Sequence, residues 1–145
     1  MNIPEIKICG LMTERDVRLI HKYEIEYAGI VLFCKESPRN NPPDRAWRLA
    51  ALLDRKVKKT AVVVSHTPDQ VEMIAHMNFD LIQIHGELSN EVLECCRLPV
   101  LRAYNLSQDP VNPQEHEKIA GYVLDAKTPG QGQPFDWSLA RDFDR

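Results

Sequence analysis

The regular alternation of short β-branched runs with amphipathic stretches is the sequence feature that most restricts the fold. Six runs rich in Val, Ile, Thr and Tyr have the length and composition of strands, and helix-compatible spacing fills most of the intervals between them. This rhythm indicates repeated βα units, and therefore an α/β domain with a parallel sheet covered by helices. The expected strands are Glu5–Cys9, Ala28–Phe33, Thr60–Val64, Leu81–Ile84, Val100–Ala103 and Tyr122–Leu124.

The expected helices differ in how clearly their starts are marked. The clearest start is at Thr13, because Thr13 and Asp16 have the spacing of a capping box directly after the first strand. Two proline-rich segments, Cys34–Pro43 and Lys127–Pro134, cannot extend a neighbouring element and are expected as loops that follow strands. The expected helices are Thr13–Tyr23, Pro43–Leu53, Pro68–His76, Glu91–Arg97 and Pro113–Ala120.

Length and charge narrow the class of protein. With 145 residues, 43% of them hydrophobic, the chain is expected to form one domain over residues 1–145 with a substantial core. Its 18 basic and 21 acidic residues are mixed along the chain, so no basic stripe predicts a nucleic-acid partner, and a small molecule is favoured. No leader pattern or long uncharged apolar run occurs, so we predict a cytoplasmic protein without a membrane partner.

The four cysteines predict reduced thiols rather than a disulfide framework. They stand at positions 9, 34, 95 and 96, without regular spacing or a Cys-x-x-Cys pair. Adjacent Cys95 and Cys96 would project from different sides of a helix, so we expect no shared metal site there. One of the two should pack in the core.

Polar residues stand at the carboxyl ends of three expected strands. Side chains alternate between the two faces of a strand, so Lys7 and Cys9 share one face of the first strand while isoleucines occupy the other. Gln83 and His85 likewise share one face of the fourth strand, and Asp125 follows the sixth. Active sites of parallel barrels form at this end of the strands, so these residues are candidates for a common site.

Taken singly, each candidate also has an ordinary structural interpretation. A cysteine after a strand is commonly a small buried hydrophobe, and an aspartate there often caps the next loop. His85 could hydrogen-bond a turn at Gly86, and Arg39 could be a solvated surface charge. The functional interpretation therefore depends on the residues as a set.

Five motifs carry that set, in an order that matches one enzyme family. They are Lys7-Ile8-Cys9-Gly10-Leu11, Ser37-Pro38-Arg39, Gln83-Ile84-His85-Gly86, Leu124-Asp125 and Gly130-Gln131-Gly132-Gln133-Pro134-Phe135-Asp136-Trp137. From about residue 5 to its end, the chain resembles the phosphoribosylanthranilate isomerase family of tryptophan biosynthesis. The opening Lys-Ile-Cys-Gly and closing Phe-Asp-Trp signatures are the most specific.

The resemblance implies a TIM-type (βα)₈ barrel and an Amadori rearrangement of a sugar phosphate that carries an anthranilate group. It implies that Cys9 is the general base and Asp125 the general acid, with Arg39 beside the reacting ribose. Ring opening needs a proton delivered to the ribose ring oxygen, and the next step needs one removed from the neighbouring carbon, so two groups must flank the sugar. No metal or organic cofactor is required. The further implied substrate-binding residues are Lys7, Gln83, His85, Gly130 and Gly132.

The chain departs from the family in length. A complete barrel takes about 200 residues or more, and only six of the eight βα units can be counted here. The family's phosphate-binding loops follow strands seven and eight, so we expect little activity from the short chain, and self-association through its open sheet edges. The favoured explanation is a fragment of a longer enzyme, because the segment from Phe135 reads as the beginning of a helix. The alternative is a non-catalytic or assembly-dependent remnant of the barrel that binds a partner chain.

Overall fold

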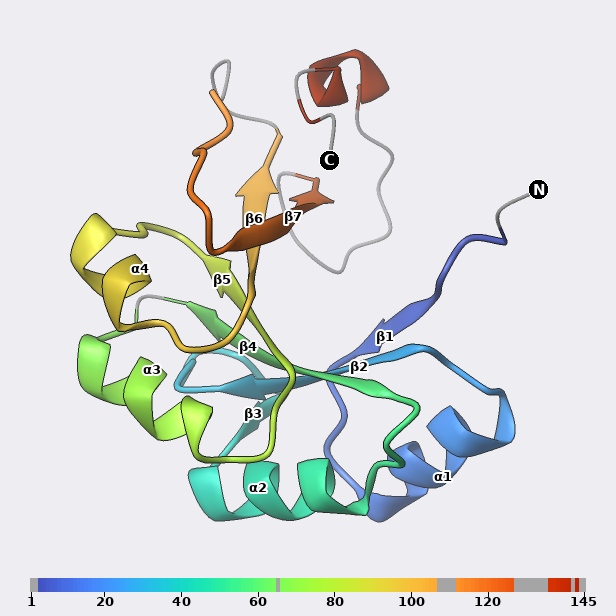
Figure 1. Cartoon of the computed structure of the whole chain (residues 1–145). Helices are drawn as coiled ribbons and strands as arrows, with labels where there is room; N and C mark the ends of the chain where they lie inside the picture. Colours follow the sequence, from blue (N-terminus) through green and yellow to red (C-terminus); the bar gives the residue numbers. More distant parts are fainter. Residues whose placement is uncertain (1–2, 65, 107–111, 127–135, 142, 144–145) are drawn as a thin grey trace.

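The computed structural model contains a curled parallel sheet with helices along its outer side (Figure 1). It describes residues 3–64, 66–106, 112–126, 136–141 and 143. The strand order is β1-β2-β4-β5-β6-β7, and the two-residue β3 (Asn40–Asn41) pairs with β2. All pairings are parallel, so the predicted α/β architecture and all six expected strands are confirmed. The bounds are β1 Lys7–Cys9, β2 Tyr27–Leu32, β4 Lys58–Val64, β5 Leu81–His85, β6 Val100–Asn105 and β7 Ile119–Asp125.

Local capping signals set the helix starts as predicted. Thr13 forms a full capping box with Asp16, and Thr67 forms another with Gln70, so both helices begin with their first amides satisfied. Pro43 occupies the first turn of α2, where its missing N–H costs nothing. No helix in the described part of the chain is long and apolar enough to cross a membrane. The bounds are α1 Glu14–Lys22, α2 Pro43–Leu52, α3 Pro68–Ala75 and α4 Asn90–Cys95, with a short 3₁₀ helix at Trp137–Ala140.

The hydrophobic core lies between the sheet and these helices. Alternate strand residues such as Ile30, Val63 and Ile84 are fully buried against the helix side chains Ile20 and Ile74. This alternation leaves the other face of each strand for the interior of the curled sheet. Burying one such side chain contributes roughly 1.5–3 kcal/mol.

One predicted helix, Pro113–Ala120, is wrong. Residues 112–116 have no regular structure, and the segment passes through a turn directly into β7. Side chains on the neighbouring strands satisfy the backbone instead: Tyr104 Oη accepts from the Gln114 amide at 2.7 Å, and Tyr122 Oη donates to the Gln114 carbonyl at 3.1 Å. These partners come from outside the segment, so its own spacing could not reveal them.

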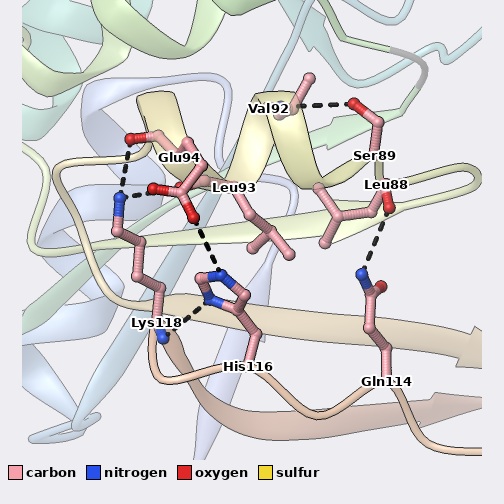
Figure 2. Close-up of polar contacts among 8 residues, drawn as sticks. All are labelled: Leu88, Ser89, Val92, Leu93, Glu94, Gln114, His116 and Lys118. Carbon is pink, nitrogen blue, oxygen red and sulfur yellow. Dashed lines mark hydrogen bonds and ion pairs between the residues drawn. The ribbon is translucent and has the colours of Figure 1, made fainter.

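The segment before β7 also contacts the end of α4 through Lys118 and His116 (Figure 2). Lys118 Nζ donates to the carbonyl oxygens of Leu93 and Glu94 at 3.0 and 2.7 Å, and His116 Nε2 lies 3.4 Å from a carboxylate oxygen of Glu94. The last carbonyls of a helix lack hydrogen-bond partners within the helix, and a cation there also interacts favourably with the negative end of the helix dipole. A lysine from the strand connection therefore caps α4.

Candidate active site

The carboxyl ends of the strands bring most of the predicted site residues to one end of the sheet. Cys9, His85 and Asp125 are the last residues of β1, β5 and β7. Because all the strands are parallel, these three residues lie at the same end, and Gln83 lies one residue pair further in. Lys7 shares the interior face of β1 with Cys9.

Gly29 leaves the space that Cys9 occupies. The two residues are register partners of β1 and β2, and a Cβ placed on Gly29 would lie 2.7 Å from Cys9 Sγ. The thiol therefore lies across the β2 backbone, and the cysteine itself is exposed. Any side chain at position 29 would push the sulfur away from this place.

Arg39 is brought to the end of β1 by its proline-rich loop. Gly10 has a φ of +89°, and its missing side chain leaves room for the Arg39 side chain, whose Nε would lie 3.2 Å from a Cβ at that position. The Arg39 amide donates to Ser37 Oγ at 3.2 Å, which fixes the Ser-Pro-Arg turn. The structure thus places Arg39 against the residue that follows Cys9.

Asn41 holds this loop in place and was not predicted from the sequence. Only 1% of it is exposed, and its amide Nδ2 lies 3.0 Å from the Leu11 carbonyl, 3.1 Å from that of Arg39 and 3.3 Å from that of Val31. A single side chain therefore ties the loop after β1, the strand β2 and the Arg39 loop together. Its position in a polar, proline-rich stretch is typical of an exposed loop, so the sequence carried no sign of its burial.

His85 is a half-buried histidine that interacts with several other polar groups of the site. Gln83 Nε2 lies 2.7 Å from His85 Nε2, and because an amide nitrogen can only donate, the imidazole nitrogen accepts. Burial lowers the pKa of His85, the negative charge of Asp125 opposes this, and the positive charges of Lys7 and Arg102 add to it. Groups on β7, β1 and β6 thus act on one imidazole, which is neutral at physiological pH.

Two further polar residues near this end were missed by sequence reasoning. Arg102 on β6 is buried, and its guanidinium bonds to backbone carbonyls of the β5 end. His66 follows β4, and neither imidazole nitrogen has a hydrogen-bond partner among the described residues. Burial first, and then the charge of Arg102, lower the pKa of His66. In the sequence, Arg102 lies within an apolar run and His66 lies in a turn-like segment before Pro68. Arginine and histidine at such positions are commonly surface residues.

The remaining predictions concern glycines, metals and cysteines. Gly130 and Gly132 lie outside the described residues. Among the residues that are described, no group of three or more His, Cys, Asp or Glu side chains could hold a metal ion. Cys96 is buried and Cys95 half-buried, as expected for adjacent residues of a helix end, and burial raises the pKa of Cys96 to about 11.

An apolar groove of about 750 Å³ lies beside this site, on the outer side of β1. Its walls are mainly side chains of β1 and α1, with Cys9 and Arg39 also lining it. Lys7, Gln83, His85 and Asp125 do not line it, so the groove belongs to the helix layer and not to the interior where the polar residues meet. The apolar wall residues are Ile6, Ile8, Leu11, Leu19, Ile20, Tyr23 and Ile25.

Comparison with known proteins gives one consistent result. The model of the family described as N-(5'phosphoribosyl)anthranilate (PRA) isomerase matches residues 6–145. A protein of Streptococcus gordonii with the name N-(5'-phosphoribosyl)anthranilate isomerase is 36% identical over 135 residues, which are 92% of this chain and 67% of that protein. A protein of Allorhizobium ampelinum with the same name is 31% identical, over 97% of this chain and 69% of its own length.

Solved structures of similar proteins have the same fold, and this chain covers about 70% of each of them. A phosphoribosyl anthranilate isomerase from Thermus thermophilus superposes with a TM-score of 0.82 at 25% identity, covering 97% of this chain and 71% of that one. The corresponding enzyme from Thermotoga maritima gives a TM-score of 0.77 at 26% identity, with coverage of 95% and 70%. The curled sheet is therefore the larger part of a TIM-type barrel.

Proposed function

The chain belongs to the N-(5'-phosphoribosyl)anthranilate isomerase family, and on that premise we propose that Cys9 and Asp125 form its acid–base pair. Members of this family are intramolecular oxidoreductases that interconvert an aldose and a ketose, and they act on a phosphoribosyl sugar phosphate. The observation that carries the proposal is the position of Cys9 and Asp125 as last residues of β1 and β7 at the same end of a parallel sheet. Two proton-transfer groups on different strands can flank one sugar.

The proposed chemistry assigns one proton transfer to each group. Asp125 donates a proton to the ribose ring oxygen while the bond from that oxygen to C1 breaks and the anthranilate nitrogen forms a double bond to C1. Cys9, as a thiolate, then removes a proton from C2, and the electron pair moves through C1 to the nitrogen. The resulting enol becomes the ketone, so protons and electrons balance without a cofactor.

The other residues are assigned to binding. Arg39, held against Gly10, makes a charge-assisted contact with the anionic substrate. Neutral His85 and its partner Gln83 line the wall between β4 and β6, and Lys7 adds positive charge from β1. By resemblance, Gly130 and Gly132, which lie outside the described residues, are also assigned to substrate binding.

The length of the chain limits what it does alone. It spans 67–70% of the length of curated relatives that it matches. By resemblance, the family's phosphate-binding loops follow the seventh and eighth barrel strands, and the 145 residues hold only six βα units. Without a phosphate anchor the substrate is not held in register, so the 145-residue chain is expected to turn over little substrate. A cytoplasmic location stays a prediction.

A second candidate function is an assembly-dependent module that associates through its open edges. The apolar groove on β1 and the edge strand itself favour it, because such surfaces are covered in stable proteins. This candidate function predicts that the 145-residue chain self-associates, which can be measured on the chain alone.

The catalytic proposal is tested in a completed barrel. Joining this chain to the C-terminal third of the Streptococcus gordonii relative supplies the missing units, and loss of anthranilate fluorescence reports turnover. Cys9→Ser and Asp125→Asn should each lower turnover by about 10²–10⁴-fold with a smaller change in substrate affinity. Arg39→Ala should weaken binding as well as turnover.

Cys95→Ser is the matched control, since this half-buried thiol lies on α4, and it should leave turnover unchanged. Near-normal turnover of both Cys9→Ser and Asp125→Asn would remove the acid–base assignment even though the family assignment stands.

A further inference from the structure

The backbone ladder between β5 and β6 stops before His85. The two strands are in register from Ile82 with Val100 to Ile84 with Arg102, whereas β5 continues to His85 and β6 to Asn105. On its other side His85 still pairs with Val64 of β4. At His85, therefore, the β5 backbone pairs with β4 but no longer with β6.

The guanidinium of Arg102 bonds to carbonyls at and beyond the end of this ladder. Its Nη1 donates to the Ile84 carbonyl at 3.1 Å and its Nη2 to the Gly86 carbonyl at 2.6 Å. These carbonyls belong to the residues immediately before and after His85. The planar fork of arginine suits two acceptors at once, whereas a lysine ammonium is a single point of charge.

The surroundings of Arg102 keep the fork in one orientation. Only 9% of the residue is exposed, and the guanidinium carbon lies 4.7 Å from the centre of the Tyr104 ring. Nη1 also lies 3.3 Å from the Ala103 carbonyl. Burying an arginine is costly unless its donors are used, and here Nη1 and Nη2 are used, whereas Nε has no hydrogen-bond partner among the described residues.

We propose that Arg102 is a positioning residue for His85, whose guanidinium bridges the carbonyls on both sides of the histidine and thereby holds the imidazole against Gln83 on the wall of the site. The proposal rests on the proposed function only in assigning that wall to the substrate. Arg102 itself reaches the backbone and Tyr104, so it acts through His85 and not on the reacting atoms.

Charges from three other strands act on the same imidazole. Asp125 faces it from β7, Lys7 from β1 and Arg102 from β6, while Gln83 of its own strand donates to Nε2. A protonated imidazole has no acceptor nitrogen for Gln83. Arg102 therefore supports the neutral, hydrogen-bonded form in two ways: it fixes the backbone, and its charge disfavours a second cation nearby.

The two contributions can be separated in the 145-residue chain by NMR, without substrate. Arg102→Met removes both the fork and the charge, and it should raise the titration midpoint of His85 and speed amide exchange at His85 and Gly86 by at least about tenfold, as for loss of bonds to a charged group. Arg102→Lys keeps the charge, so its His85 midpoint should stay near that of the wild type while exchange still rises. Arg97→Met, which removes an exposed partner of Glu72, is the control and should change neither.

The bridging role is tested by Arg102→Lys even if Arg102→Met does not fold. Unchanged exchange at His85 and Gly86 in folded Arg102→Lys would overturn the bridging role, and an unchanged His85 midpoint in folded Arg102→Met would overturn the charge contribution. Neither readout requires Cys9 or Asp125 to act as an acid or base, so failure of the catalytic proposal would be distinguishable from failure of this one.

Discussion

At the scale of single residues, side-chain features that depend on neighbouring positions could be predicted from the sequence, and features that depend on distant contacts could not. Strand parity depends only on neighbouring positions, and it put Gln83 and His85 on one face of their strand, in agreement with the 2.7 Å contact between their side chains. Asn41 and Arg102 are buried and bond to carbonyls on other strands and loops. Such long-range contacts leave no periodic trace in a single sequence.

The two half-buried histidines, His66 and His85, predict a stability that falls in acid. Burial lowers the pKa of both His66 and His85 below the ordinary value of 6.5, so the unfolded chain binds protons that the folded chain does not. Stability must then rise with pH through this range, which means that the free energy of unfolding falls as the pH drops below about 6.5. Urea unfolding between about pH 7.5 and about pH 5.5 measures the change.

Neutral replacements identify the source of that dependence. His85→Gln and His66→Gln should each flatten the pH profile, whereas His76→Gln, an exposed histidine beside Glu72, should not flatten it. A profile of the wild type that is level across this range would contradict the prediction.

At the scale of elements, helix starts were predictable where the signal is local. The capping box at Thr13 and the proline at the start of α2 each lie within one turn of the helix that they begin. The segment before β7 failed for the opposite reason, because Tyr104 and Tyr122 satisfy its backbone from two strands. The spacing of its apolar residues therefore predicted a helix that does not form.

Lys118 provides a test of how this segment supports α4. Its ammonium caps two carbonyls at the helix end, and replacing it by Met keeps much of the apolar stem but removes the charge and both bonds. We expect Lys118→Met to lower the free energy of unfolding by about 1 kcal/mol, as for a partly exposed cation at a helix C-terminus. Urea unfolding with Lys35→Met, an exposed lysine of the loop after β2, as control would check it. Equal stability of the two variants would show that the cap contributes nothing.

At the scale of the whole molecule, the βα rhythm predicted six of the seven described strands and their parallel direction. It missed the two-residue β3 and could not predict what lies beside the edge strands. In the described part of the chain, β1 pairs only with β2, and β7 only with β6. Curvature and closure depend on how many units follow one another, and a rhythm of six does not specify what covers the two edges.

The open side of β1 therefore carries the last prediction, that the isolated chain self-associates. Ile8 is 45% and Tyr23 is 64% exposed beside the apolar groove, although strand parity directs Ile8 toward a helix layer. Exposed apolar surface next to an unpaired strand edge favours pairing with another chain, and a lysine on such an edge opposes it. Ile8→Lys should shift the sedimentation coefficient at micromolar concentrations toward that of a monomer. Trp47→Lys, at a residue 53% exposed on α2 and outside the groove, should leave association unchanged, and a wild-type chain that sediments as a compact monomer would refute the prediction.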